Sequence, residues 1–233
     1  MACPSSAEER VLHHVALIAD GNRRWAKEKG LAPTEGHVEG FTKVAPRLID
    51  DLFQLGVHTV TLWCSSIKNL EREPAEVENY LRCFEILAKN LTRSAKDKAM
   101  RIVHMGNKSL LPISLRETLE KAERLTKNYT GHVVNLAIAY SGSDEICRAH
   151  QKIGSEKLSE DALFEALDTS GQPYPSPDLV IRTAGEQRLG AFMPLQTVYS
   201  ELYFVKTYFP AVTKEDLVEA VSDFGKRKRT FSK

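Results

Sequence analysis

Residues 20–25, with the sequence DGNRRW, combine a carboxylate, a glycine, an amide and two guanidinium groups directly after an apolar stretch. A carboxylate is a hard oxygen ligand of the kind that Mg²⁺ prefers. Arginine binds phosphate oxygens through paired N–H groups, and glycine lets the backbone approach a phosphate closely. These residue types fit a magnesium diphosphate. They are equally typical of a polar turn with solvated arginines, and the spacing alone does not decide between the two.

A second pair of arginines, Arg182 and Arg188, lies six residues apart across a turn that contains Gly185. Such a pair can hold a second diphosphate, or it can form loop ion pairs with Glu186. His37 stands at an expected helix start, where the backbone favours anions. For His37, the alternative is an ordinary capping or surface histidine.

These groups must be positioned by an alternation of strands and helices. Strands are expected at 14–19, 57–64, 100–104, 132–139, 178–182 and 202–205. Helices are expected at 36–55 with a kink at Pro46, and at 75–98, 114–127, 144–153, 160–167 and 214–224.

The alternation predicts an α/β fold: a mostly parallel central sheet covered by helices on both faces. We expect one domain, residues 13–233, after a flexible N-terminus, residues 1–12. Ligands of such sheets bind at the carboxyl ends of the strands. Polar clusters at 20–25, 65–72 and 182–190 each follow a strand, so the pattern predicts one composite site.

The composition excludes several classes of function. A formal net charge of +1 gives no general attraction to nucleic acid. The G-x-x-x-x-G-K-[ST] and G-x-G-x-x-G motifs of nucleotide and dinucleotide sites are absent. No apolar stretch is long enough to span a membrane, and the N-terminus lacks the apolar core of a secretory signal. The four cysteines have neither disulfide-framework nor zinc spacing, so we expect a reducing, cytoplasmic location.

Three blocks of sequence resemble the signatures of cis-prenyltransferases, the undecaprenyl (polyprenyl) diphosphate synthase family. The first begins at His14, continues through an apolar run into DGNRRWA, and ends at Gly36-His37. The second contains Ser66, Asn69 and Arg72, and the third covers 178–188 and 199–204. The blocks occur in the family's order and extend from about residue 14 to residue 231.

The resemblance implies an enzyme that joins an allylic prenyl diphosphate to isopentenyl diphosphate with Mg²⁺ and creates a cis double bond. It implies that Asp20 binds the metal and assists departure of the allylic diphosphate. Glu201 would approach the same metal, from the other subunit of a homodimer. Asn69 matches the position credited with proton removal, but a neutral amide is a poor base, so orientation of the substrate is the role expected first.

The substrate-binding residues implied in the same way are Gly21, Asn22, Arg23, Arg24, Trp25, His37, Ser66, Leu70, Arg72, Arg182, Arg188 and Gly190. An apolar tunnel would shield the hydrocarbon from water. The apolar face of the helix at 75–98 is the expected tunnel wall, although the same residues suit an ordinary core. The basic run at 226–229 suits contact with an anionic membrane surface, or simply a solvated helix end.

The sequence also departs from the family pattern. Residues 65–70 read SSIKNL where the family usually has F-S-x-x-N-W, and Gly190 replaces a common serine. Leu195 stands where tryptophan is common, and Pro33 occupies a position that is basic in some members. These changes suggest an altered second substrate, a short product or head-to-middle coupling of two allylic diphosphates. A non-catalytic partner subunit is a further alternative, but such subunits tend to lose the aspartate and the arginines that remain here.

Overall fold

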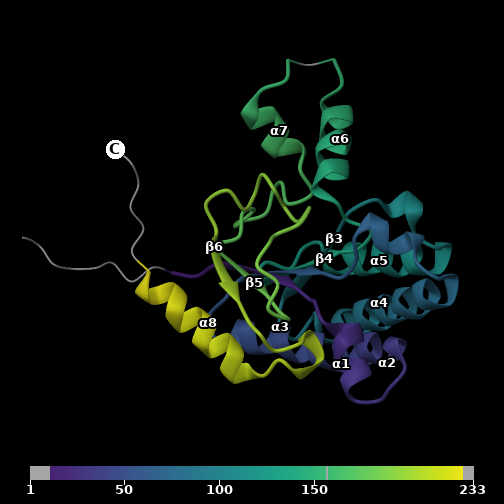
Figure 1. Ribbon diagram of the computed structural model, residues 1–233. Coiled ribbons are helices and arrows are strands. Elements are labelled where there is room, and N and C mark those ends of the chain that lie inside the picture. Colours follow the sequence, from purple (N-terminus) through teal and green to yellow (C-terminus); the bar gives the residue numbers. More distant parts are fainter. Residues whose placement is uncertain (1–10, 156, 228–233) are drawn as a thin grey trace, which may run out of the picture.

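The computed structural model describes residues 11–155 and 157–227, in which six parallel strands form one sheet of order β3-β4-β2-β1-β5-β6 (Figure 1). The strands are β1 His14–Ile18, β2 Thr59–Trp63, β3 Met100–Met105, β4 His132–Ala137, β5 Leu179–Arg182 and β6 Glu201–Phe204. The predicted strands and the α/β fold class are confirmed. Four strands are one to three residues shorter than predicted, β3 is one residue longer, and β6 is shifted by one residue.

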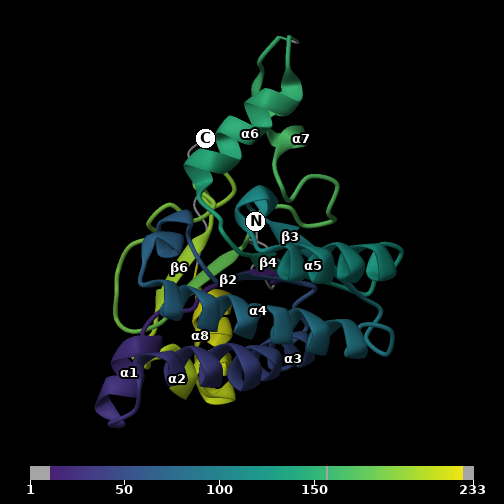
Figure 2. The same ribbon diagram turned by 90° about the vertical axis from the view of Figure 1, so that its right-hand side faces the viewer.

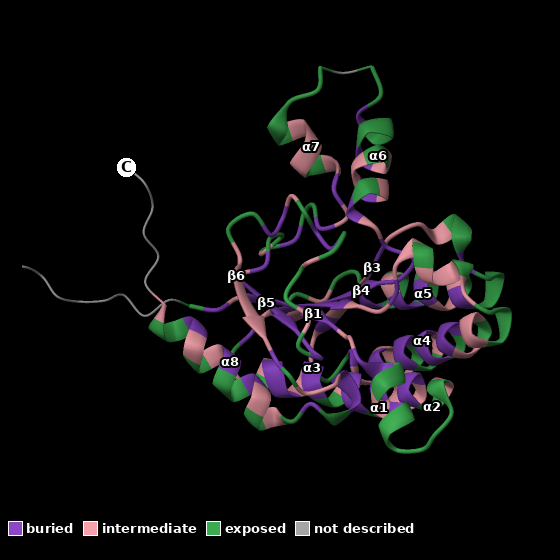
Figure 3. Cartoon of the chain, in the orientation of Figure 1, coloured by how far each residue is buried: buried purple, intermediate pink, exposed green. Residues whose placement is uncertain are grey.

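Alternate residues of β1 point to opposite faces of the sheet, as expected for a strand. Val15 and Leu17 belong to the large core cluster, whereas Ala16 and Ile18 belong to a smaller cluster on the other face. Helices build the large core, and the segment around Phe192 covers much of the smaller one. Figure 3 shows the buried residues concentrated along the sheet and on the inner faces of the helices.

The helices are α1 Asn22–Glu28, α2 Pro33–Val38, α3 Ala45–Gln54, α4 Pro74–Ser94, α5 Ile113–Thr126, α6 Gly142–Ile153, α7 Glu160–Ala166 and α8 Lys214–Lys226. Helices α3, α4, α5 and α8 contribute the buried side chains of the large core. Helices α6 and α7 rise from the opposite side of the sheet (Figures 1 and 2).

The helix expected at 36–55 is present within one continuous helical run, residues 33–54, in which α2 passes through a π-helical segment η1, Glu39–Val44, into α3. Pro46, which carries no N–H, lies in the first turn of α3 directly after the π-helical segment. The helix is therefore irregular next to the predicted position, and whether it is kinked there stays a prediction. Helix α1 was not predicted, because its seven residues carry too few apolar side chains to show a helical period.

The expected tunnel wall is packed core in this structure. On α4, Tyr80, Phe84 and Leu87 are at most 2% exposed and belong to the large cluster. The tunnel therefore stays a prediction. The predictions for residues 1–10 and for the segment after residue 227 lie outside the described residues. Leu12 is the first buried core residue of the described part. Among the described helices, none is long and apolar enough to cross a membrane.

Candidate active site

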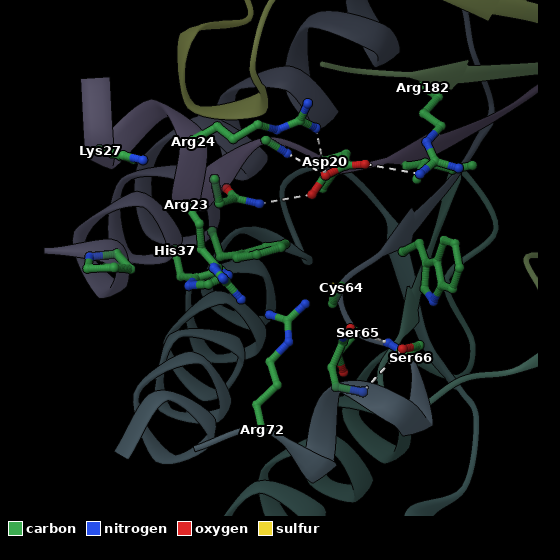
Figure 4. A pocket seen from close by; sticks show the side chains of 18 of the residues that line it. Asp20, Arg23, Arg24, Lys27, His37, Cys64, Ser65, Ser66, Arg72 and Arg182 are labelled. Atoms are coloured by element: carbon green, nitrogen blue, oxygen red, sulfur yellow. Dashed lines mark hydrogen bonds and ion pairs between the residues drawn. The ribbon is translucent and has the colours of Figure 1, made fainter. Parts of the chain in front are cut away.

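The carboxyl ends of β1, β2 and β5 meet at one edge of the sheet. In the strand register, Ile18 is level with Trp63 on one side and with Arg182 on the other. A cavity of about 710 Å³ opens beside this edge (Figure 4). It is lined by Ile18, Ala19, Asp20, Gly21, Asn22, Arg23, Arg24, Lys27, Leu31, Pro33, His37, Phe41, Trp63, Cys64, Ser65, Ser66, Asn69, Arg72 and Arg182. Residues from all three predicted clusters line this cavity, with Arg182 the sole contributor from 182–190.

Asp20 lies between two guanidinium groups at the edge of the cavity (Figure 4). Arg182 donates to its Oδ2 at 3.0 Å, and Arg24 donates to its Oδ1 at 3.4 Å. The turn that presents it requires glycine: Gly21 has φ +94°, and a Cβ there would come within 2.6 Å of the Tyr208 ring. The carboxylate remains about one-third exposed, so it can still reach a cation.

Helix α1 is held tightly against α2 and η1 by two glycines. A Cβ on Gly36 would lie 2.0 Å from the carbonyl oxygen of Asn22, and one on Gly40 would lie 2.4 Å from the Asn22 side chain. The close approach therefore needs glycine at both positions. It fixes Asn22, and with it Arg23 and Arg24, at the mouth of the cavity.

The arginines around the cavity are paired with carboxylates. Glu76 contacts Arg72 at 2.9 Å and Arg23 at 3.7 Å. Glu186 contacts Arg24 at 3.2 Å and also pairs with Arg188. A diphosphate entering the cavity would compete with these carboxylates for the same guanidinium groups.

Four buried polar atoms in the cavity lining have no hydrogen-bond partner: Asn22 Oδ1, His37 Nδ1, Trp63 Nε1 and Arg182 Nε. The described residues contain seven such atoms, so most of them belong to this one cavity. A buried polar atom without a partner costs about 1–3 kcal/mol, and native proteins contain few of them. Their concentration here indicates that a polar ligand completes the site.

His37 lies in the last turn of α2, so the expectation that it stands at a helix start is wrong. It packs between Phe41, at 6.4 Å between ring centroids, and Tyr80, at 5.8 Å. Burial lowers the pKa of His37 to about 4, although the nearby Glu76 carboxylate acts in the opposite direction. The ring is neutral at pH 7, so it can contribute a hydrogen bond and no positive charge.

Ser66 and Asn69 hold each other in a reciprocal cap at the start of the 3₁₀ segment η2, Ile67–Glu71. The Asn69 side-chain oxygen accepts from the Ser66 N–H at 2.8 Å, and the Ser66 hydroxyl accepts from the Asn69 N–H at 3.2 Å. The amide oxygen of Asn69 is therefore already engaged. This arrangement suits orientation of a substrate better than removal of a proton.

Some predicted site residues lie outside the cavity lining: Trp25, Leu70, Arg188, Gly190 and Glu201. Leu70 packs against the large core, and the Arg188 side chain is 63% exposed. Whether these residues bind substrate stays a prediction.

Glu201 is the first residue of β6 and pairs with Leu179, the first residue of β5. Asp20 instead follows the carboxyl end of β1, two residues beyond Ile18, which is level with Arg182. Three residues of strand, about 10 Å, separate Leu179 from Arg182 at the end of β5. Glu201 pairs with Arg227 at 3.0 Å. The described residues contain no cluster of three or more His, Cys, Asp or Glu side chains suited to a metal. A metal shared by Asp20 and Glu201 would therefore need Glu201 from a second subunit.

The cavity also contains residues that sequence reasoning missed. Lys27 lies one turn after Arg23 on α1, which only the existence of that helix reveals. Phe41 lines the cavity and packs edge-on against Phe84, with 4.8 Å between ring centroids. Trp63 reads in the sequence as part of the strand expected at 57–64. Val60 and Leu62 pack on one face of the sheet and Trp63 on the other, and this period-2 alternation was the available signal.

Comparison with known proteins agrees with this geometry. Residues 18–232 match the family described as "Putative undecaprenyl diphosphate synthase". The chain belongs to this family. It is 36% identical to a tritrans,polycis-undecaprenyl-diphosphate synthase (geranylgeranyl-diphosphate specific) of Pyrobaculum aerophilum, across 98% of this chain and 99% of that one. It is 38% identical to an isoprenyl transferase of Treponema denticola, across 94% and 97%.

Among solved structures, the fold is similar to the crystal structure of lavandulyl diphosphate synthase from Lavandula x intermedia in complex with dimethylallyl diphosphate. The TM-score is 0.89 with 33% identity, across 94% of this chain and 97% of that chain. As a member of this family, the chain is a prenyl-transferring enzyme of isoprenoid biosynthesis, an isoprenyl diphosphate synthase.

Proposed function

We propose that this prenyltransferase transfers the allylic group of a prenyl diphosphate to isopentenyl diphosphate and creates a cis double bond. The allylic diphosphate occupies the side of the cavity formed by α1, α2 and Arg72. Isopentenyl diphosphate occupies the side of Arg182. The observation that carries the proposal is the single cavity in which Asp20, the arginines and four unpartnered polar atoms meet.

The residues are suited to such a reaction in a defined way. The allylic C–O bond breaks with its electron pair on the leaving diphosphate, and the allylic carbon bonds to the terminal alkene carbon of isopentenyl diphosphate. Loss of a proton then forms the new double bond, and a diphosphate oxygen can accept that proton. Arg23, Arg24 and Arg72 stabilise the negative charge that develops on the leaving group.

Mg²⁺ fits the donor set at Asp20, because this ion is commonly held by one or two carboxylates together with substrate phosphates. Mg²⁺ would supply further charge stabilisation for the leaving diphosphate. The buried Phe41 side chain in the cavity lining helps to keep water from the reactive carbon. Glu201 of a second subunit is proposed to complete the metal site, which requires a homodimer. A cytoplasmic location is part of the same proposal.

Coupling of two allylic diphosphates is the second candidate. It is favoured by the likeness to lavandulyl diphosphate synthase, whose crystal structure contains the allylic compound dimethylallyl diphosphate. The altered segment at 65–70 points the same way. Ser65 is 4% exposed, and its hydroxyl accepts a hydrogen bond from the Ala139 N–H at 3.0 Å. With serine at position 65, the cavity lacks the aromatic wall that phenylalanine would supply at this position of the family pattern.

A product assay separates the two candidates. The purified chain is incubated with Mg²⁺ and dimethylallyl, farnesyl or geranylgeranyl diphosphate, each with and without labelled isopentenyl diphosphate. Products longer by five-carbon units that carry the label support the proposal. An unlabelled product that forms from allylic diphosphate alone supports the second candidate and contradicts the first.

A further inference from the structure

We propose that Trp63 is a substrate-binding residue, and that its indole N–H donates a hydrogen bond to the diphosphate of the isopentenyl substrate. The inference rests on the proposed function, since it names a contact in the second-substrate half of the cavity. It assigns a role to a side chain that the sequence indicated only as part of a strand.

The strand register places Trp63 opposite Arg182. Both residues are level with Ile18, which lies between them on β1. Two interstrand spacings of about 4.8 Å therefore separate the two backbones. Residues paired in a parallel sheet project to the same face, and all three side chains line the cavity. A ligand seated over Ile18 is flanked by Trp63 and Arg182.

The indole ring has a fixed place. It stacks on Phe192 with 5.0 Å between ring centroids and 8° between the planes, and Phe192 is fully buried. Gly190 lies beside the ring as well, since a Cβ there would be in ordinary van der Waals contact with Trp63 Cη2, at 3.5 Å. A fixed ring orients its N–H without further loss of side-chain entropy.

The indole N–H and the Nε–H of Arg182 are both buried and both lack an acceptor. An indole nitrogen is a donor only, so no other arrangement of protons can satisfy it. Both residues line the same cavity, so a ligand rich in oxygen is the partner that suits these two donors. The diphosphate proposed to bind at Arg182 meets that requirement. A hydrogen bond to a charged group contributes about 1.5–3 kcal/mol, which corresponds to roughly 10- to 100-fold in affinity.

The chain has two tryptophans, Trp25 and Trp63, so an indole ¹⁵N–¹H correlation spectrum contains two signals. The variants Trp63→Phe and Trp25→Phe assign them. We expect isopentenyl diphosphate with Mg²⁺ to move the Trp63 signal downfield, as for a hydrogen bond to an anion, and to move the Trp25 signal much less. Inorganic pyrophosphate, which lacks the hydrocarbon, should give the same direction of shift.

Kinetics of Trp63→Phe supply the second readout, since phenylalanine keeps the stack on Phe192 and removes only the donor. We expect KM for isopentenyl diphosphate to rise at least about tenfold, with KM for the allylic substrate within twofold. An unchanged Trp25 signal shows that the variant is folded. A Trp63 signal that stays in place at saturating isopentenyl diphosphate, in protein that turns this substrate over, overturns the inference. A shifted signal in protein that never elongates an allylic diphosphate supports the contact and contradicts the proposed reaction.

Discussion

One face of the sheet carries polar side chains at two neighbouring levels along the strands. The two levels differ in whether the hydrogen-bonding groups have partners within the chain. At the inner level, His14 bonds through both ring nitrogens, to the Tyr174 carbonyl at 2.8 Å and to the Thr61 hydroxyl at 2.7 Å. Asn135 donates to Thr61 at 2.9 Å and exchanges hydrogen bonds of 3.0 and 2.9 Å with Gln172. This inner network links three strands to the loop before β5.

Two residues further along the strands, the rim level presents Trp63 and Arg182, each with a buried nitrogen that has no partner. The contrast separates two uses of buried polarity. A polar group whose partners are all in the chain stabilises the fold. A polar group that lacks a partner at the edge of a cavity costs stability and is explained by a ligand. Substitutions at the two levels should therefore act on different measurements.

The largest effect is expected at the rim from Asp20→Ala. It should lower kcat by about a thousandfold or more, because the carboxylate acts mainly on charge that develops in the transition state. Binding of the allylic diphosphate should change much less. Steady-state kinetics and equilibrium titration together check this expectation.

Glu186→Gln is the matched control, because it removes another carboxylate that pairs with Arg24 but does not line the cavity. Its kcat should stay within about tenfold of the wild type, the size of 1.4 kcal/mol. Near-normal turnover by Asp20→Ala, or an equal loss in both variants, would refute a special role for Asp20.

The next effect is expected in the inner network. Thr61→Val leaves His14 Nε2 and the Asn135 amide without their shared partner. The free energy of unfolding should fall by about 2–4 kcal/mol, since two buried groups lose a hydrogen bond. Denaturant titration measures this fall. KM for both substrates should stay within twofold of the wild-type value once the fraction of folded protein is taken into account. A large rise in KM would contradict the proposal that the inner network serves the fold and not substrate binding.

Elsewhere in the cavity lining, on α2, His37→Phe should show the opposite pattern. Phenylalanine keeps the contact with Phe41 and Tyr80 and removes the unpartnered Nδ1. Stability should be equal or higher by up to about 1 kcal/mol, while KM for the allylic diphosphate rises about tenfold. Thermal unfolding and kinetics on one preparation check both. A destabilised variant with an unchanged KM would assign His37 to the fold.

The smallest effect concerns pH. Burial lowers the pKa of His14 to about 3 and those of His37 and His104 to about 4, whereas unfolded histidine titrates near 6.5. The unfolded state therefore binds more protons as pH falls below about 7, so these residues reduce stability in acid. Each should cost roughly 0.8 kcal/mol between pH 8 and pH 6. The fall in unfolding free energy over this range should be smaller by that amount in His37→Phe; an equal fall would show that the pKa of His37 is the same in the folded and unfolded states.

Much of this architecture could be predicted from the sequence, because its signals are local. Apolar runs located all six strands, and the polar clusters after three of them indicated the edge where the cavity opens. Helix α1 could not be found, since its placement depends on Gly36 and Gly40 admitting Asn22. The role of Trp63 was also invisible, because a missing hydrogen-bond partner is a property of the three-dimensional surroundings.

Binding stoichiometry tests the central claim of two diphosphates in one cavity most directly. Calorimetric titration would use a non-reacting thio analogue of the allylic diphosphate, followed by isopentenyl diphosphate, both with Mg²⁺. We predict that one molecule of each binds per chain. His37→Phe should weaken binding of the analogue alone, and Arg182→Ala should weaken binding of isopentenyl diphosphate more than binding of the analogue. Displacement of the analogue by isopentenyl diphosphate, with one molecule bound in total, would contradict the account.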